Sequence, residues 1–253
     1  MMSDPEIQSA TEPAPGLSQW QRVSYVFTAP SKTFEDIKRG HKSWWMPFLI
    51  AAIFGYLLYG VVTTKIGMEQ VVQNQIHLNP KQEDNLNQHP EQREMSMKIS
   101  LGITKGIFLG NPLLLLLILG VGSLGLWGTI NFIFGGKATY SSIFTVWMYA
   151  GLPGIIKVLL GTIVIFAGTA PESFNIKNYS PTNLGAFLNP LETNAALYSF
   201  ATSIDIVTIW TLVLLGIGTA MVAGVKRSSG YIAVFGWWAI FVVIGVGIAA
   251  VTG

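Results

Sequence analysis

The chain has 253 residues, of which 51% are hydrophobic and 11% are charged, and its net charge is +2. Soluble domains carry about 25% charged residues, so this composition excludes an ordinary soluble globule. A net charge so close to zero gives little support for nucleic-acid binding, and the absence of cysteine excludes disulfides, thiolate nucleophiles and cysteine metal sites.

The N-terminal region is polar and rich in proline and small residues, with no basic residue before Arg22 and no early apolar core. It therefore does not read as a cleavable signal peptide. We expect a disordered tail over residues 1–19, an amphipathic juxtamembrane segment over 20–43 and a transmembrane domain over 44–253.

The juxtamembrane segment is predicted to contain a short helix that Ser31 caps and Gly40 ends. Phe34 and Ile37 lie three residues apart and share one face of it. This face is expected to lie against the lipid headgroups, or the helix is a solvated surface helix. Its basic residues are expected near anionic lipid: Lys38, Arg39 and Lys42.

Apolar blocks of about 20 residues, the length that crosses the hydrocarbon core of a bilayer, recur after the interfacial pair Trp44 and Trp45. The sequence therefore predicts an all-α integral membrane bundle of about five transmembrane helices. The expected spans are residues 44–64, 112–134, 142–168, 203–225 and 231–251.

Proline and glycine predict how these spans bend and pack. Pro153 lies inside the third span, so a kink or two half-helices are expected, with a candidate hinge at Gly151, Pro153 and Gly154. The short turn 226–230 makes spans four and five antiparallel neighbours. Small residues four apart predict close packing at two places: Gly216 with Ala220, and Gly245 with Ala249.

Two long loops join the spans. In the loop 65–111, residues 91–109 are predicted to form a helix that lies along the membrane before the second span. The loop 169–202 contains prolines with apolar residues between them. It is expected to form an interfacial or re-entrant hairpin that packs on protein.

The distribution of basic residues predicts the orientation. Eight lie on the N-terminal side of the spans and six on the opposite side, mostly in the long loop 65–111, which counts less in the positive-inside rule. The N-terminus is therefore expected in the cytoplasm and the C-terminus outside. The eight are Arg22, Lys32, Lys38, Arg39, Lys42, Lys137, Lys226 and Arg227; the six are Lys65, Lys81, Arg93, Lys98, Lys105 and Lys177.

The sequence shows no pattern of a catalytic or metal centre. Its histidines lie outside the predicted spans, the HExxH motif is absent, and the spans contain one acidic residue, Asp205. Serine–histidine and paired-aspartate chemistries are therefore not expected. We predict no catalytic residue, no cofactor and no metal site.

Lys157 and Asp205 are the ionisable residues that fall inside the predicted spans. Charged groups in a bilayer cost about 2.5 to 3.5 kcal/mol and usually pair or face a cavity. The expected depths of the two residues differ by about 10 Å, most of which a lysine stem can bridge. We predict an ion pair or a shared polar cavity in the outer half of the membrane, which serves as a structural lock or, alternatively, as a transport relay.

Several stretches carry a family resemblance: Ala29–Phe34 with Trp44–Phe48, Gly135–Tyr140 with Tyr149–Pro153, and Asp205–Trp210 with Leu214–Gly218. They resemble bacterial Yip-domain proteins, relatives of the Ypt-interacting (Yip-one) membrane family, over about residues 29–250. The resemblance implies five spans with a cytosolic N-terminus. Eukaryotic members are associated with Rab-type GTPases and vesicle traffic, whereas for the bacterial branch the resemblance implies an architecture.

The leading hypothesis is a non-enzymatic multispan membrane protein of Yip type, an adaptor or organiser of membrane shape or protein sorting. The alternative is a small transporter or channel that uses a polar site around Lys157 and Asp205, and a membrane-embedded enzyme is the third. Expected partners are the lipid bilayer and other membrane proteins or a second copy, with no nucleic acid. The resemblance implies the bacterial inner (plasma) membrane.

Overall fold

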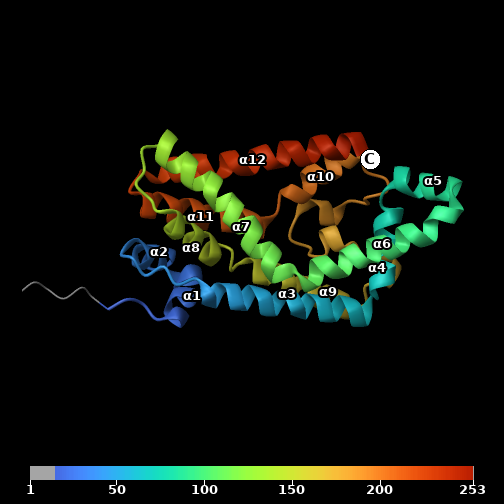
Figure 1. The fold of residues 1–253 in the computed structure, drawn as a ribbon, viewed down its shortest axis with the longest axis horizontal. Coiled ribbons are helices and arrows are strands. Elements are labelled where there is room, and N and C mark those ends of the chain that lie inside the picture. The colour runs from blue at the N-terminus through green and yellow to red at the C-terminus, as the bar shows by residue number, and fades with distance from the viewer. Residues whose placement is uncertain (1–14, 253) are drawn as a thin grey trace, which may run out of the picture.

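The computed structural model describes residues 15–252, so most of the tail expected over residues 1–19 lies outside the described residues. The described part is a bundle of helices, and five segments are long and apolar enough to cross a membrane. They lie along the long axis of the molecule (Figure 1). The predicted fold class, an all-α membrane bundle with five spans, is confirmed.

Each expected span corresponds to one of these segments, with ends that differ by a few residues. The segments are α3 (Trp45–Lys65), α7 (Asn111–Gly128) with the short π-helix η1 (Thr129–Ile133), α8 (Tyr140–Ala150) with α9 (Gly154–Phe166), α11 (Ile206–Ala223) and α12 (Arg227–Thr252).

Two short helices close one end of the bundle, which we call the proximal end. The first is α1 (Gln19–Thr28), where Ser18 and Gln21 form a capping box. The second is α2 (Pro30–Lys38), which begins at Pro30 without a side-chain cap, instead of at Ser31. Phe34 and Ile37 are fully buried in the main core. Their shared face therefore packs on the bundle and not on headgroups, because α8 and α11 offer it an apolar surface.

The opposite, distal end is built from the long loop after α3. It contains α4 (Met68–His77), α5 (Pro80–Gln88) and α6 (Pro90–Leu109). The C-terminal end of α6 packs beside the distal half of α3: the rings of Tyr59 and Phe108 are 5.3 Å apart, and the Tyr56 hydroxyl donates to the Leu109 carbonyl at 3.0 Å. Further along α6, Met97 and Leu101 pack against buried apolar residues of α4 and α5. That α6 lies along the membrane stays a prediction.

The second long loop covers the distal ends of the other helices. It contains the 3-10 turns η2 (Pro171–Ser173), η3 (Ile176–Asn178) and η4 (Leu184–Phe187), followed by α10 (Ala195–Ser203). The Asn74 amide of α4 donates to the Pro171 and Phe174 carbonyls at 2.7 and 2.9 Å. These bonds satisfy irregular backbone with protein groups, as a loop near the membrane requires.

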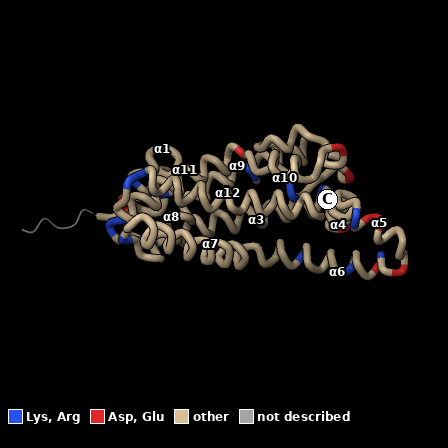
Figure 2. Tube along the Cα trace, turned by 90° about the horizontal axis from the view of Figure 1, so that it is seen from above, with Lys and Arg blue, Asp and Glu red and all other residues tan. Residues whose placement is uncertain are grey.

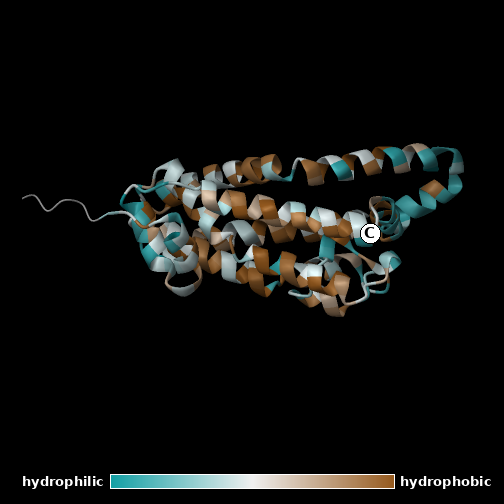
Figure 3. Ribbon diagram, turned by 90° about the horizontal axis from the view of Figure 1, so that it is seen from below, coloured by the Kyte–Doolittle hydropathy of each residue, from teal (hydrophilic) through white to brown (hydrophobic). Residues whose placement is uncertain are grey.

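The helices differ in how much protein surrounds them. Within the most apolar 18-residue stretch of each helix, 50% of the residues of α11 are buried inside the protein, whereas 11% of those of α12 are buried. Hydrophobic residues concentrate along the middle of the bundle, and hydrophilic residues mark both ends and the tip between α5 and α6 (Figure 3). This pattern is that of a bundle whose outer helices are covered by lipid.

Glycine brings α11 and α12 into close contact. A Cβ at Gly230 would lie 2.8 Å from the Ala220 Cβ, and Gly216 packs under Tyr231. The predicted close packing at Gly216 and Ala220 is therefore confirmed. Gly245 makes a looser contact, since its Cβ would lie 4.0 Å from the Ser199 hydroxyl.

Candidate functional site

The structure places Lys157 and Asp205 together in the distal half of the bundle. The Lys157 Nζ lies 3.1 Å from Asp205 Oδ2, and the two side chains are 29% and 2% exposed. Lys157 is one turn into α9, whereas Asp205 immediately precedes α11 and caps it by accepting the Thr208 amide at 2.7 Å. The pair thus ties the third span to the fourth.

A loop residue completes the bonding of this carboxylate. The Thr182 hydroxyl donates to Asp205 Oδ2 at 2.6 Å. The backbone of the same loop pairs with the residues around Asp205: the Ile206 amide donates to the Thr182 carbonyl at 3.0 Å and the Leu184 amide to the Ile204 carbonyl at 3.2 Å. Both carboxylate oxygens therefore have donors, which is the arrangement that a buried charge requires.

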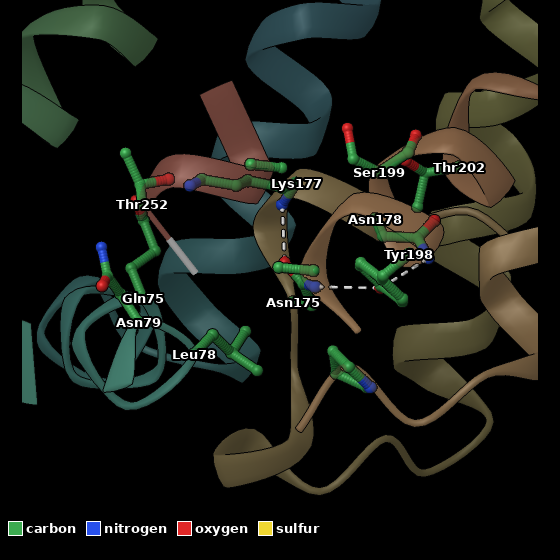
Figure 4. A pocket seen from close by; sticks show the side chains of 13 residues that line it. Gln75, Leu78, Asn79, Asn175, Lys177, Asn178, Tyr198, Ser199, Thr202 and Thr252 are labelled. Carbon is green, nitrogen blue, oxygen red and sulfur yellow. Dashed lines mark hydrogen bonds between the residues drawn. The ribbon is translucent and has the colours of Figure 1, made fainter. Parts of the chain in front are cut away.

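The polar contacts continue outward from this pair toward the distal surface. The Asn183 amide donates to Asn178 Oδ1 at 2.7 Å, and the amides of Asn178 and Asn175 donate to the Tyr198 hydroxyl at 3.0 and 3.3 Å. Figure 4 shows the Asn175, Asn178 and Tyr198 side chains converging. We call this network the distal polar cluster; it consists of Lys157, Asn175, Asn178, Thr182, Asn183, Tyr198 and Asp205.

A cavity of about 270 Å³ lies beside the distal polar cluster and is lined by polar side chains from α4, the second loop, α10 and α12. The Lys177 side chain extends across it toward Thr252 at the end of α12 (Figure 4). Nearby, the Lys81 ammonium donates to the Val251 carbonyl at 2.6 Å. Cations at the C-terminal end of a helix interact favourably with its dipole, so Lys81 stabilises the end of α12.

The candidate hinge residues lie at an interruption of the third span. Gly151 and Pro153 are in the turn between α8 and α9, and Gly154 begins α9. They are in the middle of the span and contribute no side chain to the distal polar cluster. That this turn acts as a hinge stays a prediction.

A second buried ion pair lies at the proximal end, and the sequence analysis did not find it. Arg22 Nε donates to Asp36 Oδ2 at 2.6 Å, and both side chains are 5% exposed. His41 Nδ1 lies 2.9 Å from Asp36 Oδ1, and the Tyr149 hydroxyl lies 2.7 Å from Gln19 Oε1. These contacts fasten α1 and α2 to α8. No sequence signal links residues 14 positions apart on different helices.

An apolar groove of about 910 Å³ opens between α7 and α12, with α8 and α11 at its floor. Three tryptophans, Trp147, Trp237 and Trp238, line it together with aliphatic side chains and two glycines. At one end of the groove the Trp237 indole donates to the Thr129 hydroxyl at 2.9 Å. The groove therefore has an aromatic edge that a hydrogen bond anchors to α7 and η1.

The distal polar cluster contains residues that sequence reasoning missed. Thr182 carries no local signal, because its role depends on the loop folding back over α11. Thr208 could have been identified with Asp205, since an aspartate directly before an apolar run is a typical helix cap. Within residues 15–252 there is no group of three His, Asp or Glu side chains that could hold a metal ion.

The five apolar spans, the lipid-facing helices and the buried ion pairs define a multi-pass integral membrane protein in contact with the lipid bilayer. The chain belongs to the Yip1 domain family, which matches residues 24–249. It is 25% identical to the membrane protein YknW of Bacillus subtilis (strain 168) over 221 residues, which are 86% of this chain and 85% of YknW. No solved structure gives a significant match. The predicted resemblance is confirmed.

Proposed function

We propose that this protein is a non-enzymatic adaptor or organiser of membrane shape or protein sorting that acts through helix contacts inside the membrane. The observation that carries this proposal is the apolar groove between α7 and α12. Helices associate in lipid through close packing at surfaces with small residues. On the α7 wall of the groove, Gly122 and Gly125 pack against Trp147 and Trp237 of the same chain. The apolar side chains left exposed for a partner helix are Leu117, Ile118, Val121 and Phe241.

We further propose that the protein lies in the bacterial inner membrane with its N-terminus in the cytoplasm. Lys and Arg gather at the proximal end, whereas the distal end carries charges of both signs (Figure 2). A proximal end in the cytoplasm agrees with the positive-inside rule. The bacterial relative supports the inner membrane as the location.

A site-specific photocrosslinking experiment tests the adaptor role. A photoreactive residue at Phe241, which lines the groove and is 61% exposed, is expected to crosslink to a defined membrane protein in native membranes. The matched control is Ile248 on the same helix, 59% exposed and outside the groove. Equal crosslinking at both positions would argue against a specific partner.

The alternative function is a small transporter or channel that uses Lys157 and Asp205. The observation in its favour is their contact at membrane depth, together with the interrupted helix. Reconstitution of the purified chain into vesicles separates the two proposals. Flux of ions or small solutes through the chain alone would overturn the adaptor proposal, and its absence together with a groove-specific partner would support it.

A further inference from the structure

The interruption between α8 and α9 leaves backbone groups without their helical partners. Pro153 has no amide hydrogen, the Leu152 amide donates to the Tyr149 carbonyl at 3.1 Å, and the Gly154 amide donates to the Gly151 carbonyl at 2.9 Å. The carbonyls of Met148 and Ala150 therefore lose the amides that an unbroken helix would present to them. Irregular backbone at membrane depth is tolerated where it is buried in protein or lines a water-filled cavity.

A cavity of about 230 Å³ adjoins this interruption. Met148, Gly151, Leu152 and Gly154 form one wall, and α3 and α7 form the others. We call it the midspan cavity; its further lining residues are Pro47, Ala51, Phe54, Gly55, Leu58, Phe108, Asn111, Leu115, Leu119, Ile155, Val158 and Tyr179.

Two polar side chains, Asn111 and Tyr179, line the midspan cavity. A Cβ at Gly55 would lie 2.7 Å from Asn111 Oδ1, so glycine at that position makes room for the amide. Burial raises the pKa of the Tyr179 hydroxyl, and the nearby Asp205 carboxylate adds to the effect, so this hydroxyl is protonated at neutral pH. The cavity thus offers uncharged donors and acceptors beside the carbonyls freed at the helix interruption.

The midspan cavity lies beside the middle of two of the spans. Gly55 is close to the midpoint of α3 (Trp45–Lys65), and Gly151 is close to the midpoint of the segment Tyr140–Phe166. Tyr179, which lines the cavity, packs its ring against Gly161 of α9, one turn beyond Lys157. Tyr179 therefore lies between the midspan cavity and the distal polar cluster.

We propose that the midspan cavity is hydrated and forms a blind water-filled path from the distal side to the centre of the bilayer. At about 30 Å³ for each water molecule, it accommodates a cluster of up to about seven. These waters donate to the carbonyls of the interrupted helix and bond Asn111 and Tyr179. This inference does not rest on the adaptor proposal, because a water-filled path into the bundle is compatible with either function.

Thiol accessibility tests this inference, and the chain contains no cysteine of its own. Ala51→Cys places a thiol in the midspan cavity, and Ile53→Cys, at a position 55% exposed on the same helix, places one toward lipid. In vesicles with the protein in one orientation, a small membrane-impermeant methanethiosulfonate reagent is added to one side at a time. The exposed loop position Asn189→Cys identifies the distal side.

The Ala51→Cys thiol is expected to react about tenfold or more faster than the Ile53→Cys thiol, and only from the side that labels Asn189→Cys. Adding Leu119→Trp, which fills the cavity, should slow the Ala51→Cys reaction about tenfold. Equal rates at the two thiols, reaction from the proximal side, or no effect of Leu119→Trp would each overturn the inference. If Ala51→Cys does not fold, Leu115→Cys and the lipid-facing Leu117→Cys on α7 provide the same comparison.

Discussion

Asp205 connects α9, the second loop and α11 in the distal half of the bundle. Its carboxylate caps α11 through Thr208, accepts the Thr182 hydroxyl and pairs with Lys157. The sequence identified Lys157 and Asp205 because ionisable groups are costly in a membrane. It could not identify Thr182, which reaches Asp205 only because the second loop folds back over the start of α11.

Neutralising one member of this pair is expected to destabilise the protein. Lys157→Met leaves the buried Asp205 carboxylate without its cation and should lower the free energy of unfolding by about 2 to 4 kcal/mol, less than for a fully buried pair because Lys157 is partly exposed. Adding Asp205→Asn keeps an amide oxygen as the helix cap while removing the charge. The double variant should therefore recover most of the loss in a double-mutant cycle measured by unfolding in detergent. Additive losses would show that the two residues do not act as a pair.

At the scale of elements, glycine and proline decide how the helices meet. Pro153 ends α8 and separates it from α9, as its position in the third span predicted. Gly230 permits the backbone of α12 to approach α11, where Gly216 and Ala220 form the opposing surface. The spacing of small residues indicated this surface on α11, but the partner residue on α12 follows from the fold.

Two glycines of α12 are expected to respond to the same substitution with opposite signs. Gly230→Ala introduces a methyl group against Ala220 and the Gly216 carbonyl, and should destabilise the protein by about 1 to 3 kcal/mol. Gly236→Ala meets nothing within 4 Å and should be neutral or stabilising by up to about 1 kcal/mol, because alanine restricts the unfolded chain. Thermal unfolding of the two variants measures the difference. Equal effects would mean that α11 and α12 are not closely packed at Gly230.

At the scale of the whole molecule, the two ends of the bundle differ in the charges that they carry. Lys and Arg gather at the proximal end, whereas the distal end carries charges of both signs around α4, α5 and α6 (Figure 2). The distal end also holds the polar cavity and the distal polar cluster. The orientation therefore determines which compartment meets these polar surfaces.

The proposed orientation predicts which loops an impermeant thiol reagent reaches. Asn189→Cys, exposed at the distal end, should be labelled in intact cells, whereas Ser228→Cys, exposed at the proximal end, should be labelled only after the membrane is opened. Asn189 lies in the second loop, and Ser228 lies exposed in the first turn of α12, so both variants are expected to fold. The reverse pattern would place the N-terminus outside.

The sequence by itself determined the class of protein, the five spans, the interrupted third helix and the family. Each of these follows from local properties: the length of an apolar block, the missing amide hydrogen of a proline, the identity of short motifs. Only the tertiary structure decided that Phe34 and Ile37 are buried, that the C-terminal end of α6 packs beside α3, that Arg22 pairs with Asp36, and that Thr182 bonds Asp205. These contacts join residues far apart in the chain, and their energies depend on burial and geometry that no local pattern encodes.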